Sequence, residues 1–166
     1  WILNKLNNLV KLVRKHMEKY EFNIVGSELY SFIWDNFCDW YIEMVKPRLY
    51  NKEDKTRQTA GYVLNKVLED SLKLLHPFMP FVTEEIYKMM PNKIEESIMI
   101  SSYPEYDKNI NYDLEEKEIL NMLEYVTLFR NKLHDINCGK DFEIKTNLDN
   151  KLLFNLLKLN DKLVDN

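Results

Sequence analysis

The sequence is poor in glycine and in cysteine, with three glycines and two cysteines in 166 residues. So few glycines exclude a glycine-rich phosphate loop, and no GxSxG nucleophile motif occurs. The cysteines, Cys38 and Cys138, lie too far apart in sequence to indicate a disulfide framework. Reduced thiols are typical of the cytoplasm, which is the location we expect. The sequence therefore predicts no catalytic residue of these nucleophilic or phosphate-binding classes.

Metal-binding motifs and membrane spans are also missing. His134 and Cys138 are four residues apart, but two ligands do not hold a zinc ion. No apolar run approaches the ~18 residues that a membrane helix needs. We therefore expect no metal site, no cofactor and no membrane contact.

The charge is unevenly distributed along the chain. The net charge is -4, yet the first 57 residues hold ten Lys and Arg against eight Asp and Glu. The remainder is acidic, so a surface that faces phosphates is expected in the first third of the chain. Five cations between residues 46 and 57 form its densest part: Lys46, Arg48, Lys52, Lys55 and Arg57.

Apolar residues recur every three or four positions through most of the chain, which predicts helices. The first covers about residues 2–18, and the second begins after an N-cap at Asn23 and runs to about Pro47. Asp54 or Thr56 caps the third, a short one lies between Pro80 and Pro91, and a long one runs from Asp113 to Gly139. The segment "SIMISSYP" is expected to lie extended across the bundle. The fold prediction is an all-α, up-and-down helical bundle over residues 1–136, with a short truncated α/β-like unit over residues 137–166.

The second helix carries the residues that most resemble a site. Its predicted buried face consists of Leu29, Ile33, Phe37, Trp40 and Met44. Trp34 and Tyr41 fall on the shoulder of that face, where a ring either covers the core edge or stacks on a base. The opposite face carries carboxylates at spacings of four, which are either solvated or accept hydrogen bonds from base amines: Asp35, Asp39 and Glu43.

Several stretches resemble valyl-tRNA synthetases, which are class I aminoacyl-tRNA synthetases. "FCDWYIEMVKPRLY", "LKLLHPFMPFVTEEIY" and "SIMISSYPEYD" are similar to the region that follows their catalytic core. "WILNKLNNLV" resembles the helix that begins their anticodon-binding domain, and "LFRNKLHDINCGKDFEI" the segment after the bundle. The HIGH and KMSKS motifs that bind ATP in this class are absent. The resemblance therefore implies a module that binds the anticodon arm of valine tRNA and is not an enzyme by itself. The parent protein would be a valine–tRNA ligase that uses ATP in a separate catalytic domain.

The resemblance also implies roles for individual residues. Lys46, Arg48, Lys52 and Arg57 would position tRNA phosphates. Asn36 or Asp39 would accept hydrogen bonds from the amines of the central adenine and third-position cytosine of the anticodon, with Trp34 and Tyr41 as an alternative reading surface. The partner would be tRNA rather than DNA, and the module would be a monomer. The alternative is a structural or protein-interaction helical bundle that does not bind RNA.

Overall fold

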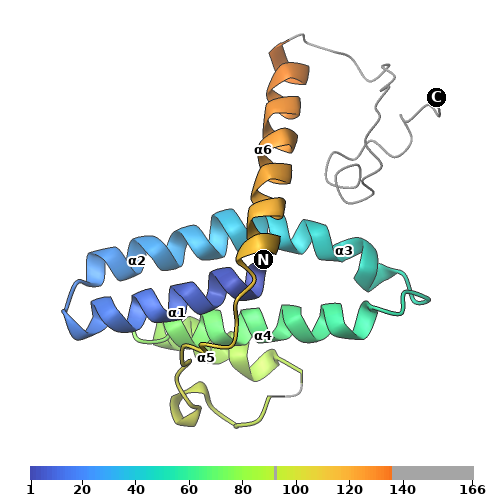
Figure 1. Cartoon of the computed structure of the whole chain (residues 1–166). Helices are drawn as coiled ribbons and strands as arrows, with labels where there is room; N and C mark the ends of the chain where they lie inside the picture. The colour runs from blue at the N-terminus through green and yellow to red at the C-terminus, as the bar shows by residue number, and fades with distance from the viewer. Residues whose placement is uncertain (92, 136–166) are drawn as a thin grey trace. The chain divides into compact units, whose positions relative to one another are not determined.

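The computed structural model describes residues 1–91 and 93–135, and the regular secondary structure of these residues is helical, without any strand (Figure 1). The elements are α1 (Ile2–Glu18), α2 (Phe22–Ser31), η1 (Phe32–Tyr41), α3 (Ile42–Tyr50), α4 (Arg57–Leu75), α5 (Pro80–Met89), η2 (Ile98–Ile100) and α6 (Asp113–Asp135). The prediction of an all-α fold is confirmed. The chain divides into two compact units, Trp1–Asp113 and Leu114–Asn166. The expected partial unit over residues 137–166 lies outside the described residues, as do Cys138 and the predicted helix end at Gly139.

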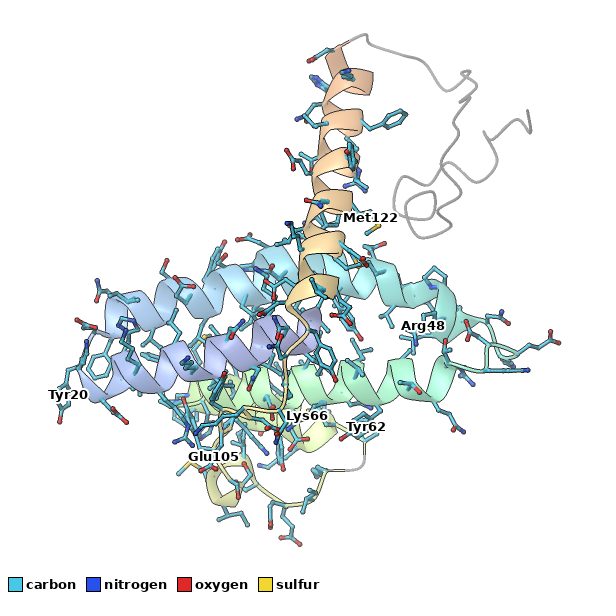
Figure 2. The ribbon with its side chains drawn as sticks, in the orientation of Figure 1. Tyr20, Arg48, Tyr62, Lys66, Glu105 and Met122 are labelled. Carbon is cyan, nitrogen blue, oxygen red and sulfur yellow. The ribbon has the colours of Figure 1, made fainter. Side chains whose placement is uncertain are left out.

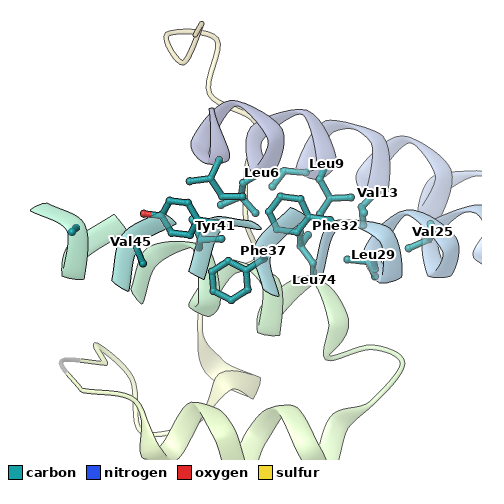
Figure 3. Packing of buried hydrophobic residues seen from close by; sticks show 14 residues of the cluster. Leu6, Leu9, Val13, Val25, Leu29, Phe32, Phe37, Tyr41, Val45 and Leu74 are labelled. Atoms are coloured by element: carbon teal, nitrogen blue, oxygen red, sulfur yellow. The ribbon is translucent and has the colours of Figure 1, made fainter. Parts of the chain in front are cut away.

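The first unit is an up-and-down bundle (Figure 1). The helix α1 packs against α2 and α4, and α4 also packs against α3 and α5. α2, η1 and α3 follow one another without a break and form one long rod. The core between α1, this rod and α4 is apolar (Figure 3), and its buried members include Leu6, Leu9, Val13, Val25, Leu29, Phe32, Phe37, Tyr41, Val45 and Leu74. The apolar residues that recur every three or four positions predict the buried face of α1 as Ile2, Leu6, Leu9, Val13 and Met17. This prediction is confirmed, with Met17 only partly buried.

The rod differs from the prediction because η1 is a π-helix of ten residues. A π-helix bonds each N–H to the carbonyl five residues back, as the Ile42 N–H does to Phe37, so its turns are wider than those of an α-helix. The buried positions are therefore spaced by five residues and then by four: Phe32, Phe37, Tyr41 and Val45. The prediction that Trp40 lies in the core and Tyr41 on its shoulder is wrong. The wide turn exchanges their places.

Two helix starts also bear on the rod and the loop that follows it. The predicted N-cap at Asn23 is wrong, because α2 begins at Phe22 and Asn23 lies inside the helix. The turn before it is made by Tyr20, whose φ of 59° is positive. Thr56 does precede α4 as predicted, but its side chain makes no capping bond to the helix. Pro47 lies inside α3, which continues to Tyr50.

After the short η2 turn, the chain runs along α1 and is fastened to it by polar side chains. The Asn7 amide donates to the Asp107 carbonyl at 2.8 Å, and its oxygen accepts from the Asp107 N–H at 2.9 Å. Asn4 accepts from the Tyr112 N–H at 3.1 Å, and Arg14 donates to the Pro104 carbonyl at 2.7 Å. We call residues 103–113 the strap. The prediction that residues 97–104 are extended holds only for the second half of the segment, because Ile98–Ile100 forms a 3-10 turn.

None of the helices in residues 1–91 and 93–135 is long and apolar enough to cross a membrane. Within those ranges, no three His, Cys, Asp or Glu side chains come together as a set of metal ligands.

Candidate nucleic-acid interface

The loop that joins α3 to α4 is held in shape by its own polar side chains. The Asp54 carboxylate accepts hydrogen bonds from the Thr56 N–H at 2.7 Å and the Thr56 hydroxyl at 2.6 Å. These bonds lower the pKa of Asp54, with a smaller contribution from the Arg48 charge. Asn51 accepts from the Glu53 N–H at 3.1 Å. We call this loop, with the cations Lys46, Arg48, Lys52, Lys55 and Arg57, the basic end.

Two arginines brace the basic end from opposite sides. Arg48, on α3, donates to the Thr56 hydroxyl at 2.9 Å and to its carbonyl at 3.3 Å. Arg57, the first residue of α4, donates to the Leu49 carbonyl at 2.9 Å, near the end of α3. A guanidinium carries five N–H donors, so each arginine keeps donors for an anion after making these bonds. The bracing places both charges in fixed positions.

The lysines of the basic end differ from the arginines. Lys46 forms an ion pair with Glu43 one turn earlier. The hydrogen bond to Glu43 is the main cause that raises the pKa of Lys46, and the nearby Tyr50 side chain adds a smaller contribution in the same direction. Lys52 and Lys55 are exposed. The structure therefore places the four predicted phosphate-binding residues at one α3–α4 junction, with Lys46 partly neutralised.

The four predicted base-reading residues all belong to η1, but they differ in exposure. Asp39 is exposed, and the Trp34 side chain is 51% exposed, with its ring edge-on to Tyr30 at 6.3 Å between centroids. Asn36 donates from its amide nitrogen to the Ser31 carbonyl at 3.2 Å, which leaves its side-chain oxygen as an acceptor. Tyr41 instead is only 9% exposed and stacks on Phe37 at 6.1 Å in the core. Burial raises the pKa of its phenol.

One exposed aromatic at the basic end was missed by the sequence analysis. Tyr50 ends α3 and is 78% exposed. The signal was present in "KPRLYNK", where the ring stands within a run of cations. It was overlooked because helical spacing assigns rings to a core or a shoulder, and Tyr50 lies where the helix stops.

Comparisons with known proteins identify the family of the chain. A family model described as the anticodon-binding domain of tRNA ligase matches residues 1–148. The chain is 43% identical to a valine–tRNA ligase of Clostridium perfringens over 137 residues, which are 82% of this chain and 16% of that protein. It is 43% identical to the Thermotoga maritima enzyme over 145 residues, 87% of this chain and 16% of the relative. For Clostridium acetobutylicum the identity is 37% over 160 residues, 94% of this chain and 18% of the relative.

The chain thus spans between 16% and 18% of the length of these relatives. The family model, by contrast, covers most of the chain, including all the elements from α1 to α6. The chain therefore belongs to the family of anticodon-binding domains of tRNA ligases.

Proposed function

We propose that this chain binds the anticodon arm of valine tRNA as one domain of a valine–tRNA ligase, which joins valine to its tRNA with ATP. The basic end carries the proposal, because its cations are fixed on a braced loop in a member of an anticodon-binding family. The similarity to valine–tRNA ligases of several bacteria supports valine as the amino acid. The domain itself would use no cofactor and act as a monomer in the cytoplasm.

The first part of the mechanism is phosphate binding. Lys46, Arg48, Lys52 and Arg57 would neutralise backbone phosphates and release their counterions. Arg48 and Arg57 are held before RNA arrives, so less side-chain freedom is lost on binding. These contacts fix the position of the anticodon arm but do not read its sequence.

The second part is base reading along η1. The free oxygen of Asn36 and the exposed carboxylate of Asp39 are acceptors for the exocyclic amines of adenine and cytosine. Trp34 is about half exposed, so part of its indole ring is accessible for stacking. Burial leaves little of the Tyr41 ring for a base, so of the two predicted rings Trp34 is the better placed.

Binding to a valine anticodon hairpin at several salt concentrations tests the proposal. A slope of about two to four in log K against log salt is expected from the phosphate contacts. Arg48→Ala should weaken all hairpins equally and lower that slope by about one. Asn36→Ala or Asp39→Ala should cost about 1–3 kcal/mol on the valine hairpin, and almost nothing once the central adenine is replaced. The absence of any hairpin binding at low salt would overturn the proposal.

A role in protein contacts is the second candidate, and the outer face of α5 and η2 favours it. Large apolar side chains are exposed there, including Phe81 at 85%, Met89 at 75% and Met99 at 71%. Large exposed apolar side chains on neighbouring elements are a feature of surfaces that another protein covers. The hairpin experiment separates the two candidates, because a bundle with only this role leaves the basic end solvated and binds no RNA.

A further inference from the structure

Tyr50 combines exposure with a fixed backbone. Its side chain is 78% exposed, while the residues on both sides are anchored. Leu49 packs against the core, and its carbonyl accepts from Arg57 at 2.9 Å. The Asn51 N–H bonds to the Pro47 carbonyl at 3.2 Å. The ring therefore projects into solvent from a chain segment that has little freedom to move.

The sequence on both sides of this ring is rich in cations, although Glu53 and Asp54 follow it. Arg48 and Lys52 lie two residues before and after it, and the Lys46 side chain is near enough for the Tyr50 side chain to help raise the pKa of its ammonium group. The exposed Tyr20 differs from Tyr50 in its position. Tyr20 is 80% exposed but lies at the opposite end of the bundle from Arg48 (Figure 2).

An exposed ring in a cation-rich segment offers the two features that bind single-stranded nucleic acid. The ring supplies a face on which an unpaired base stacks, and the cations neutralise the phosphates that flank that base. A paired stem cannot use the ring in this way, because its bases are already stacked inside the helix. The arrangement thus distinguishes an unpaired nucleotide from a duplex.

We propose that Tyr50 stacks on an unpaired base of the bound RNA while Arg48 and Lys52 contact the adjacent phosphates. The inference rests on the proposed function and adds to it a residue that selects for unpaired nucleotides. The base contacts Tyr50 only through its π-face, which every base has. Tyr50 therefore favours a loop over a stem without favouring one base over another.

The test compares three variants on two RNA probes. The probes are the valine anticodon hairpin and a fully paired duplex of the same length, and the variants are Tyr50→Ala, Tyr50→Phe and the matched control Tyr20→Ala. Tyr50→Ala should weaken hairpin binding about 5- to 150-fold, the range that the loss of one stacked base gives. Tyr50→Phe should bind like the wild type because it keeps the ring. Tyr20→Ala should have no effect, and duplex binding should not change in any variant.

The salt dependence gives an independent readout. Tyr50→Ala removes no charge, so its slope in log K against log salt should equal that of the wild type, unlike the slope of Arg48→Ala. Wild-type affinity for the hairpin in Tyr50→Ala overturns the inference, as does an equal loss on the duplex or a Phe variant as weak as the Ala variant. In those cases wild-type binding still supports the proposed function. A wild-type chain that binds no hairpin overturns both.

Discussion

The helix α1 and the rod formed by α2, η1 and α3 line the same core, yet only one of them follows its sequence pattern. In α1 the apolar residues at spacings of three and four are the ones that pack inward, such as Leu6 and Val13. In the rod the predicted positions Leu29 and Phe37 are buried and Ile33 packs partly against the core, but the pattern then fails. Tyr41 and Val45 are buried in place of the predicted Trp40 and Met44, because ten residues adopt π geometry. The difference shows that hydrophobic spacing identifies a buried face only while the hydrogen-bond pattern of the helix stays constant.

Polar side chains accompany the change of geometry in the rod. Asn36 donates to the Ser31 carbonyl, and Ser31 in turn donates from its hydroxyl to Asp35 at 2.7 Å. Such bonds offer the backbone alternatives to the regular ladder. α1 has no comparable group of short polar residues on one turn of its middle, where "LVKLV" is regular. π segments often occur at functional sites, and here the segment carries all four predicted base-reading residues.

The largest expected effect comes from substitutions that test which residues of the rod face the core. Phe37→Ala removes a ring that is 5% exposed and should lower the free energy of unfolding by about 3–5 kcal/mol. Trp40→Ala should cost less than half as much, because Trp40 is only partly buried and is not a member of the core cluster around Phe37. Urea unfolding of the two variants gives both values. A larger loss for Trp40 than for Phe37 would restore the regular α-helical phase and contradict the π geometry.

The regular helix should respond as its pattern predicts. Leu6→Ala removes a side chain that is 4% exposed, and we expect a loss of about 2–4 kcal/mol from the lost burial and the cavity left behind. Lys15→Ala, on the exposed face of α1, should change stability by less than about 0.5 kcal/mol. Equal losses in this pair would mean that the packing of α1 is described incorrectly.

The hydrogen bonds between α1 and the strap allow a further test. Asn7→Ala leaves the Asp107 carbonyl and N–H without their side-chain partner, which should cost about 1–3 kcal/mol. Asn8→Ala is the matched control, since Asn8 is exposed on the next position of the same helix. Thermal unfolding of both variants measures the difference. A similar shift in melting temperature for the two would show that the strap contributes nothing.

The smallest effect is expected in the loop that follows the rod. Hydrogen bonds from Thr56 lower the pKa of Asp54 below its ordinary value of 3.8 in the folded chain. Its contribution to stability is therefore present above that value and is lost as the pH falls through the lowered folded-state pKa. Wild type should melt slightly above Asp54→Asn at pH 6, and the gap should close in strong acid, whereas Glu53→Gln should show no such gap. A gap that widens on acidification would reverse the assigned sign.

Much of this arrangement could be predicted because it is local. The start of the short helix at Pro80, the start of α6 at Asp113 and the buried face of α1 all follow from neighbouring residues. The roles of Asn4 and Asn7 do not, because their partners lie about a hundred positions later in the chain. At the site, the run of cations from Lys46 to Arg57 was visible in the sequence. The hydrogen bonds that brace its arginines depend on how the α3–α4 loop closes, so they could not be predicted from the sequence.

The bonds from Asn4 and Asn7 to the strap have a consequence for hydrogen exchange. Each oxygen accepts from a backbone N–H of the strap, at Tyr112 and Asp107, across about a hundred intervening residues. These two amides belong to no helix ladder of their own, so local fraying of a helix end does not expose them. They exchange with solvent only when the strap separates from α1. Their exchange rates therefore measure how often the chain opens at the contact that joins its beginning to residues 103–113.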